Sequence, residues 1–229
     1  MSRGRVMFVG CGPGAPDLLT LRAVRALECA DVVVWSPSLL DRDALAAHAR
    51  PGAEIVAWPP ATPRDILDVF ARASAEQLVV VRLKGGDPTL LGQLEPELSA
   101  ARELGLTCEI VPGVSAHAAA AAALGCELAA PAAPLLLADR AALADAPPGS
   151  WRVAIYGAGR DPGALQAALL ARGIPASAPC VVAVEVSRRD EALVPCRLDE
   201  LAETVADHGL GVLTVVLAGA PAGPREAPP

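Results

Sequence analysis

Residues 82–92, RLKGGDPTLLG, combine the only lysine of the chain with two adjacent glycines, an aspartate and a proline. They follow an apolar run at 78–83 that has the composition of a buried strand. An open α/β sheet binds its ligand outside the carboxyl ends of its strands, where such a turn would lie. Two glycines let the backbone approach a ligand without a Cβ in the way, and Asp87 offers a carboxylate. We expect a ligand-binding turn here, although an ordinary glycine turn has the same local pattern.

Two more glycine-containing turns follow predicted strands. The first, VGCGPGAPD at 9–17, matches the G-x-G-x-x-G/A dinucleotide pattern. We reject that interpretation because Pro13 and Pro16 remove two N–H groups that would bind a pyrophosphate. The second, PGVSA at 112–116, leads into an alanine-rich helix whose first N–H groups would be free for a ligand. His117 in that helix is a candidate base, but a single histidine there is more often solvated or packed.

The elements that would position these turns alternate along the first half of the chain. This alternation indicates a mostly parallel sheet with helices on its faces. Thr62 with Pro63 and Asp65 is a strong helix start, and Asp17 is an expected N-cap for the first helix. The expected strands are 5–10, 31–35, 53–56, 78–83 and 107–111. The expected helices include 18–30, 90–105 and one that starts at Thr62 and carries an apolar stripe to Ala73.

A connector with two prolines at 126–134 marks a change in sequence composition, and we expect a domain boundary there. We expect an N-terminal α/β domain at 1–125, a C-terminal α/β domain at 126–219 and a disordered proline-rich tail at 220–229. The patterns of the second domain predict strands at 135–138, 151–156, 179–186 and 211–218, with helices after Asp161 and around Leu201.

The composition excludes several classes of protein. The formal net charge is −7, the aromatic content is 3%, and no basic run occurs, so nucleic acid is not an expected partner. No apolar run approaches the roughly 20 residues that cross a bilayer. The N-terminal apolar run is too short for a signal peptide, which predicts a cytoplasmic protein without a membrane partner. The six cysteines form no C-x-x-C pair, so we expect no metal.

Taken together, the segments at 9–20, 81–88 and 110–116 resemble the tetrapyrrole methylase family in order and spacing. The resemblance covers roughly residues 5–220. It implies two α/β domains, each with a mostly parallel or mixed sheet flanked by helices, and a ligand cleft between them. It also implies a homodimer, S-adenosylmethionine as methyl donor with S-adenosylhomocysteine as product, and a cobalamin- or siroheme-pathway tetrapyrrole as acceptor.

Within the family two similarities compete. The segments at 38–40 and 111–128 resemble precorrin-4 C11-methyltransferases, and RLKGGDP at 82–88 resembles uroporphyrinogen-III methyltransferases. The longer match favours precorrin-4. At 129–139 the polar side chains of the family pattern are missing, which leaves open a non-catalytic relative that binds donor or tetrapyrrole. A methylase that acts on a peptide backbone is a third interpretation.

The resemblance also implies roles for individual residues. Asp87 and Glu127 are the candidates for a catalytic base, while Lys84 and Arg140 would bind acceptor carboxylates. A sulfonium methyl is already activated, so the protein mainly aligns the reactants, and no metal or nucleophilic side chain is needed. The residues implied for the donor site are Pro13, Gly85, Gly86, Asp87, Leu90, Ser115, Ala116, Tyr156 and Gly157.

Overall fold

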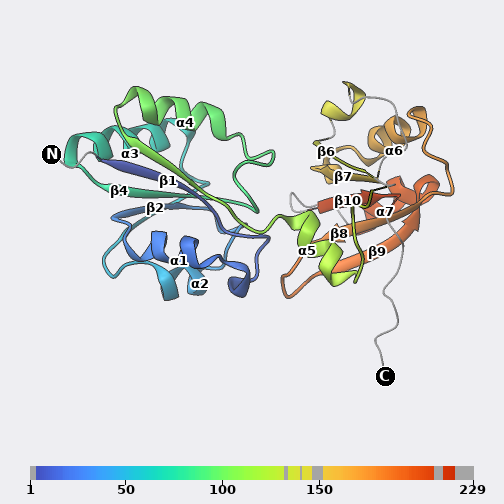
Figure 1. Cartoon of the computed structure of the whole chain (residues 1–229), viewed down its shortest axis with the longest axis horizontal. Coiled ribbons are helices and arrows are strands. Elements are labelled where there is room, and N and C mark those ends of the chain that lie inside the picture. The colour runs from blue at the N-terminus through green and yellow to red at the C-terminus, as the bar shows by residue number, and fades with distance from the viewer. Residues whose placement is uncertain (1–3, 132–133, 140, 146–151, 209–213, 220–229) are drawn as a thin grey trace. The chain divides into compact units, whose positions relative to one another are not determined.

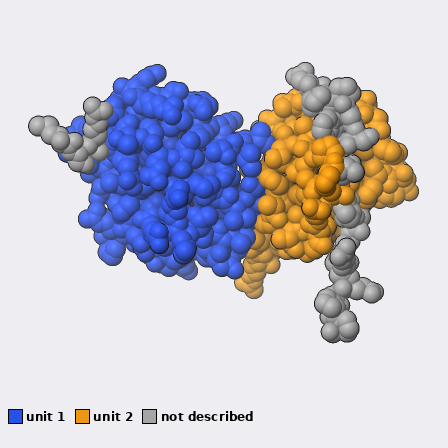
Figure 2. Space-filling view, viewed as in Figure 1, with its two compact units in different colours: residues 1–115 blue, residues 116–229 orange. Residues whose placement is uncertain are grey.

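The computed structural model describes residues 4–131, 134–139, 141–145, 152–208 and 214–219. The chain divides into two compact units, residues 1–115 and 116–229 (Figure 2). Each unit contains a five-stranded sheet with helices, so the predicted two-domain α/β fold class is confirmed. The predicted domain boundary at 125/126 stays a prediction, and the predicted tail lies outside the described residues.

The first unit has a fully parallel sheet in the order β3-β2-β4-β1-β5 (Figure 1). All five expected strands are present. Their bounds are β1 (Arg5–Gly10), β2 (Val32–Trp35), β3 (Glu54–Ala57), β4 (Val79–Lys84) and β5 (Thr107–Val111). The helices between them are α1 (Leu21–Glu28), α2 (Arg42–His48), α3 (Pro63–Glu76) and α4 (Leu94–Glu103).

Helices cover both faces of this sheet (Figure 1). Side chains alternate between the faces along each strand, so neighbouring residues enter different cores. The core under α1 and α2 contains Met7, Val9, Leu27, Leu45 and Leu83. The core under α3 and α4 contains Val6, Phe8, Phe70, Val80 and Leu98. Alternation from Val80 therefore places Arg82 and Lys84 on the α3/α4 face.

Local sequence explains where these helices begin. The predicted capping box is confirmed, because the Thr62 side chain accepts from the Asp65 N–H and the Asp65 carboxylate accepts from the Thr62 N–H. The prediction of Asp17 as an N-cap is wrong. Pro16–Leu18 forms a separate 3-10 helix, and α1 begins three residues later with Thr20 as its N-cap, accepting from the N–H of Ala23 at 3.1 Å.

The second unit has a mixed sheet in the order β6-β7-β10-β8-β9, in which the β6–β7 pair is parallel and the other pairs are antiparallel. Its strands are β6 (Leu135–Asp139), β7 (Arg152–Tyr156), β8 (Pro179–Val184), β9 (Ala192–Arg197) and β10 (Thr214–Ala218). Its helices are α5 (Ala116–Ala123), α6 (Pro162–Ala171) and α7 (Leu201–His208). No helix in the described part of the chain is long and apolar enough to cross a membrane.

One strand was missed by the sequence patterns. β9 contains Pro195, which cannot donate a backbone hydrogen bond, and its burial does not alternate cleanly. It lies at the edge of the sheet, opposite β8, where a proline is tolerated.

Candidate functional site

Two of the predicted turns contact each other through their backbones at the carboxyl edge of the first sheet. β1 and β4 are neighbouring parallel strands that end at Gly10 and Lys84. Beyond the ends of these strands, the N–H of Gly86 donates to the carbonyl of Gly12 at 2.8 Å, and the N–H of Gly12 donates to the carbonyl of Gly86 at 3.3 Å. This small antiparallel bridge fixes the turn after β4 against the turn after β1.

The turn after β5 joins this contact through Gly113. A Cβ at Gly113 would overlap the carbonyl oxygen of Gly86, and a Cβ at Gly10 would lie 2.5 Å from that oxygen and 2.7 Å from the Gly113 nitrogen. Side chains are excluded from the junction for this reason. Three loops from three neighbouring strands therefore meet backbone to backbone.

Asp87 holds the second and third turns together. One of its carboxylate oxygens accepts from the N–H of Gly113 at 3.0 Å. The other accepts from the N–H of Thr89 at 2.8 Å and from its hydroxyl at 2.5 Å. Both oxygens are thus used within the loops, which assigns Asp87 a structural role in the shape of the turn.

These contacts also set the charge of Asp87. Burial works to raise the pKa of Asp87, but the hydrogen bonds from Thr89 and Gly113 outweigh it and lower the pKa below its usual value. A carboxylate that is so stabilised takes up a proton poorly at neutral pH. The arrangement favours loop support and a fixed negative charge over proton abstraction.

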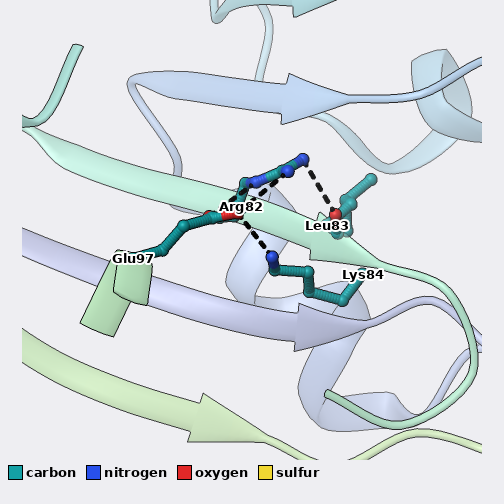
Figure 3. Close-up of polar contacts among 4 residues, drawn as sticks. All are labelled: Arg82, Leu83, Lys84 and Glu97. Atoms are coloured by element: carbon teal, nitrogen blue, oxygen red, sulfur yellow. Dashed lines mark hydrogen bonds and ion pairs between the residues drawn. The ribbon is translucent and has the colours of Figure 1, made fainter. Parts of the chain in front are cut away.

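A buried cluster of charges lies directly before this turn (Figure 3). Glu97 of α4 accepts from Arg82 Nε at 2.9 Å and Nη2 at 3.2 Å, and from Lys84 Nζ at 2.6 Å. The side chains of Arg82 and Lys84 are only 6% and 9% exposed. We call Arg82, Lys84 and Glu97 the charge triad. It contains two cations and one carboxylate.

Other groups complete the environment of the charge triad. The Arg82 guanidinium lies over the ring of Trp58, 5.6 Å from its centroid, in a cation–π contact. Burial lowers the pKa of Lys84, although the hydrogen bond that Lys84 donates to Glu97 opposes this shift. For Glu97, burial works to raise the pKa, but its bonds to Arg82 and Lys84 dominate and lower it. Glu97 is therefore held as a carboxylate.

In the second unit, Tyr156 at the end of β7 bonds to His117 in the first turn of α5. The Tyr156 hydroxyl lies 2.6 Å from His117 Nδ1 and accepts from the His117 N–H at 3.4 Å. Burial lowers the pKa of His117 and raises that of Tyr156. The lowered pKa favours the neutral imidazole, and the short contact joins Nδ1 of this ring to the Tyr156 hydroxyl.

Comparison with known proteins identifies the family of this chain. A family model described as Tetrapyrrole (Corrin/Porphyrin) Methylases matches residues 5–202. The chain belongs to the tetrapyrrole methylase family.

The similar proteins are named for two different acceptors. A precorrin-4 C(11)-methyltransferase of Mycobacterium tuberculosis is 44% identical over 126 residues, which cover 55% of this chain and 50% of that protein. The crystal structure of a cobalt precorrin-4 methyltransferase, a cobalamin biosynthetic enzyme, has a TM-score of 0.85 at 27% identity and covers 94% of each chain. A uroporphyrin-III C-methyltransferase from Thermus thermophilus, complexed with S-adenosylhomocysteine, has a TM-score of 0.73 at 28% identity, covering 94% of this chain and 97% of that one.

The match to the M. tuberculosis methylase spans about half the length of that protein. The same holds for the siroheme synthase of Methylococcus capsulatus, which is 31% identical over 97% of this chain.

The donor-site residues predicted from sequence lie in both units of the chain. Gly85, Gly86 and Asp87 lie in the β4 turn, next to the Gly12 and Gly113 contacts. The remaining ones in the first unit, Pro13, Leu90 and Ser115, are half-buried in the three turns. Ala116, Tyr156 and Gly157 belong to the second unit, and a Cβ built at Gly157 meets nothing within 4 Å. Their contact with a donor stays a prediction.

The residues predicted to be catalytic or to bind the acceptor have different surroundings. Lys84 is engaged with Glu97 and nearly buried. Glu127 is exposed between α5 and β6, and its main-chain carbonyl accepts from Arg152 Nη1 at 2.6 Å. Arg140 lies outside the described residues. The roles predicted for all three stay predictions.

Sequence reasoning missed the acid of the charge triad and the partner of His117. Two cations at alternate positions of a buried strand share one face, and this pattern signals a buried acid on the covering helix. This pattern could have indicated Glu97, which lies early in the following helix. The bond between His117 and Tyr156 has no local signal, because 39 residues separate the two.

Proposed function

We propose that this chain is an S-adenosylmethionine-dependent C-methyltransferase that acts on a tetrapyrrole intermediate of cobalamin biosynthesis, with carbon 11 of precorrin-4 as the methylated position. The observation that carries the proposal is the backbone contact of the turns after β1, β4 and β5, joined by Gly12, Gly86 and Gly113. The family membership of the chain gives this contact its interpretation as a donor site.

The chemistry of these turns fits the donor. Gly85 is exposed, and the bare backbone around it can present N–H and C=O groups to a nucleoside and an amino acid moiety. The ionised Asp87 places negative charge beside them, which favours a donor that carries a sulfonium and an ammonium. Bound S-adenosylmethionine would supply an already electrophilic methyl group. The residues of this chain would then orient the donor and exclude water.

Precorrin-4 is preferred over uroporphyrinogen III as acceptor because the M. tuberculosis relative is 44% identical over 126 residues and because the longer resemblance at 111–128 favours the same acceptor. The RLKGGDP segment supports uroporphyrinogen III or another precorrin as the alternative. A further alternative is a non-catalytic methylase that retains donor binding, because residues 129–139 have lost the polar side chains of the family pattern. Homodimer formation belongs to the same proposal and rests on the family resemblance.

Calorimetric titration with S-adenosylhomocysteine tests the donor site first. Gly85→Trp fills the turn, and a Cβ there meets only the flexible end of Leu39, 2.8 Å away, so the protein should still fold. Gly163→Trp is the matched control, since Gly163 is exposed at the start of α6 with open space around it. We expect micromolar-range binding by the wild type and the control, and loss of binding in Gly85→Trp.

Turnover assays then separate the alternatives. Methyl transfer to precorrin-4 but not to uroporphyrinogen III supports the preferred acceptor, and the reverse result would replace it. Donor binding without transfer to either acceptor would indicate a non-catalytic methylase. A folded wild-type protein that binds no S-adenosylhomocysteine would rule out the methyltransferase proposal.

A further inference from the structure

The strand end at Lys84 connects the charge triad to the glycine junction. The Lys84 carbonyl accepts from the N–H of Cys11 at 2.9 Å and from its Sγ at 3.1 Å. The Lys84 ammonium donates to Glu97 at 2.6 Å. One residue thus bonds to the β1 turn through its main chain and to α4 through its side chain.

The next two residues have no side chains with which to hold their own position. Gly86 has a φ of 60°, a conformation open to glycine, and its position depends on hydrogen bonds with Gly12. The turn is therefore fixed from outside, by Lys84 at its entrance and Asp87 at its exit.

Glu97 determines whether Lys84 can stay in place. Without the carboxylate, two nearly buried cations on the same strand face would be left without the acid that both contact. Buried charges that lose their partner are strongly unfavourable, so the Lys84 side chain would move toward water. Arg82 has a second stabilising contact in Trp58, whereas the bond to Glu97 is the side-chain contact that the structure gives Lys84.

From this geometry we propose that Glu97 is a positioning residue, which acts through Lys84 to fix the Gly85–Gly86 turn for the methyl donor. The inference rests on the proposed function for its link to the donor. It assigns Lys84 to the support of the turn, a role distinct from direct contact with acceptor carboxylates.

The test uses Lys84→Met, Glu97→Gln and the double variant in the full chain. Lys84→Met removes one cation and leaves the Arg82–Glu97 pair balanced, so folding should be retained. Glu54→Gln is the matched control, because Glu54 forms a more exposed ion pair with Arg72 in the same unit. Thermal unfolding of every variant checks that differences in binding do not come from unfolded protein.

We expect about a tenfold weaker affinity for S-adenosylhomocysteine in each single variant and no further loss in the double variant. The control should bind as the wild type does. Additive losses, or wild-type affinity in a folded Lys84→Met protein, would overturn the inference. With the acceptor in hand, a positioning role for the donor raises the KM for S-adenosylmethionine in Lys84→Met, whereas direct acceptor contact would raise the KM for the tetrapyrrole instead.

A ligand-free measurement keeps this inference separate from the proposed function. Hydrogen exchange of the Gly86 amide should be faster in Lys84→Met and Glu97→Gln than in the wild type and in Glu54→Gln. Unchanged exchange contradicts the inference even when donor binding is confirmed. Absence of binding by the wild type would instead contradict the proposed function. Faster exchange of the Gly86 amide in the two variants would still support the proposal that Glu97 fixes the turn.

Discussion

Asp87 accepts a hydrogen bond from the main-chain N–H of Gly113, 26 residues further along the chain. This contact ties the turn after β4 to the turn after β5, two strands that are separated in the sheet by β1. It makes the shape of the site dependent on one carboxylate.

Asp87→Asn should weaken the junction without adding bulk. Hydrogen bonds to a charged group contribute about 1.5–3 kcal/mol each. The substitution leaves one neutral, weaker acceptor oxygen and replaces the other oxygen with an NH2 group that cannot accept. We expect about a tenfold loss of affinity for S-adenosylhomocysteine together with a lower midpoint of chemical unfolding. Asp68→Asn, at an exposed position of α3, is the control and should change neither quantity. Equal affinity of Asp87→Asn and wild type would contradict the structural role.

The same carboxylate should make stability depend on pH. The pKa of Asp87 is lowered in the folded state, so its contribution is fully present above its ordinary value of about 3.9. It is lost as the pH falls through the folded pKa. The difference in unfolding free energy between wild type and Asp87→Asn should be constant above about pH 5 and shrink below about pH 4. A difference that is independent of pH down to pH 2 would show that the folded pKa is not set by these bonds.

Gly113→Ala tests the exclusion of side chains from the junction. The added Cβ would overlap the Gly86 carbonyl oxygen, a backbone atom that cannot move without opening the bridge to Gly12. We expect destabilisation by about 2 kcal/mol or more, measured by urea unfolding. Gly163→Ala, with open space around its Cβ, should be neutral or stabilising by up to about 1 kcal/mol. Similar stability of the two variants would mean that the loops can separate freely.

His117 gives the second unit a different pH response. Burial lowers the pKa of His117, so between its folded pKa and its ordinary value of about 6.5 the unfolded chain binds more protons. Stability should therefore fall as the pH drops through about 6.5. His117→Asn offers Oδ1 as an acceptor to Tyr156 but does not titrate. Its unfolding free energy should lose less between pH 7.5 and pH 5 than that of the wild type, and parallel curves would contradict the assignment.

Much of the first unit could be predicted from its sequence because its signals are local. The apolar runs, the capping box at Thr62 and the glycines that follow β1, β4 and β5 indicate where elements begin and end. The predicted helix at 90–105 begins four residues later, because Leu91 and Gln93 have positive φ values that no residue pattern signals. Glu97 and Gly113 reach the site only through the crossover connections of the chain. Their contacts therefore depend on tertiary structure.

The second unit was less predictable for a related reason. β10 pairs with β7 and β8, which lie far from it in sequence. β9 lies at the edge of the sheet, and an edge strand needs no continuous apolar run. Ala192–Arg197 combines a proline with exposed positions, so propensity argued against a strand. Pairing with β8 along its whole length outweighs that propensity.

Pro195 has a consequence for the behaviour of this chain in concentrated solution. An edge strand presents a row of free N–H and C=O groups that can recruit a strand from another molecule and begin aggregation. A proline within an edge strand interrupts the row of donors, and it is accommodated where its missing N–H would face away from the partner strand. The residue that concealed β9 in the sequence thus also protects that edge of the second sheet from unwanted association.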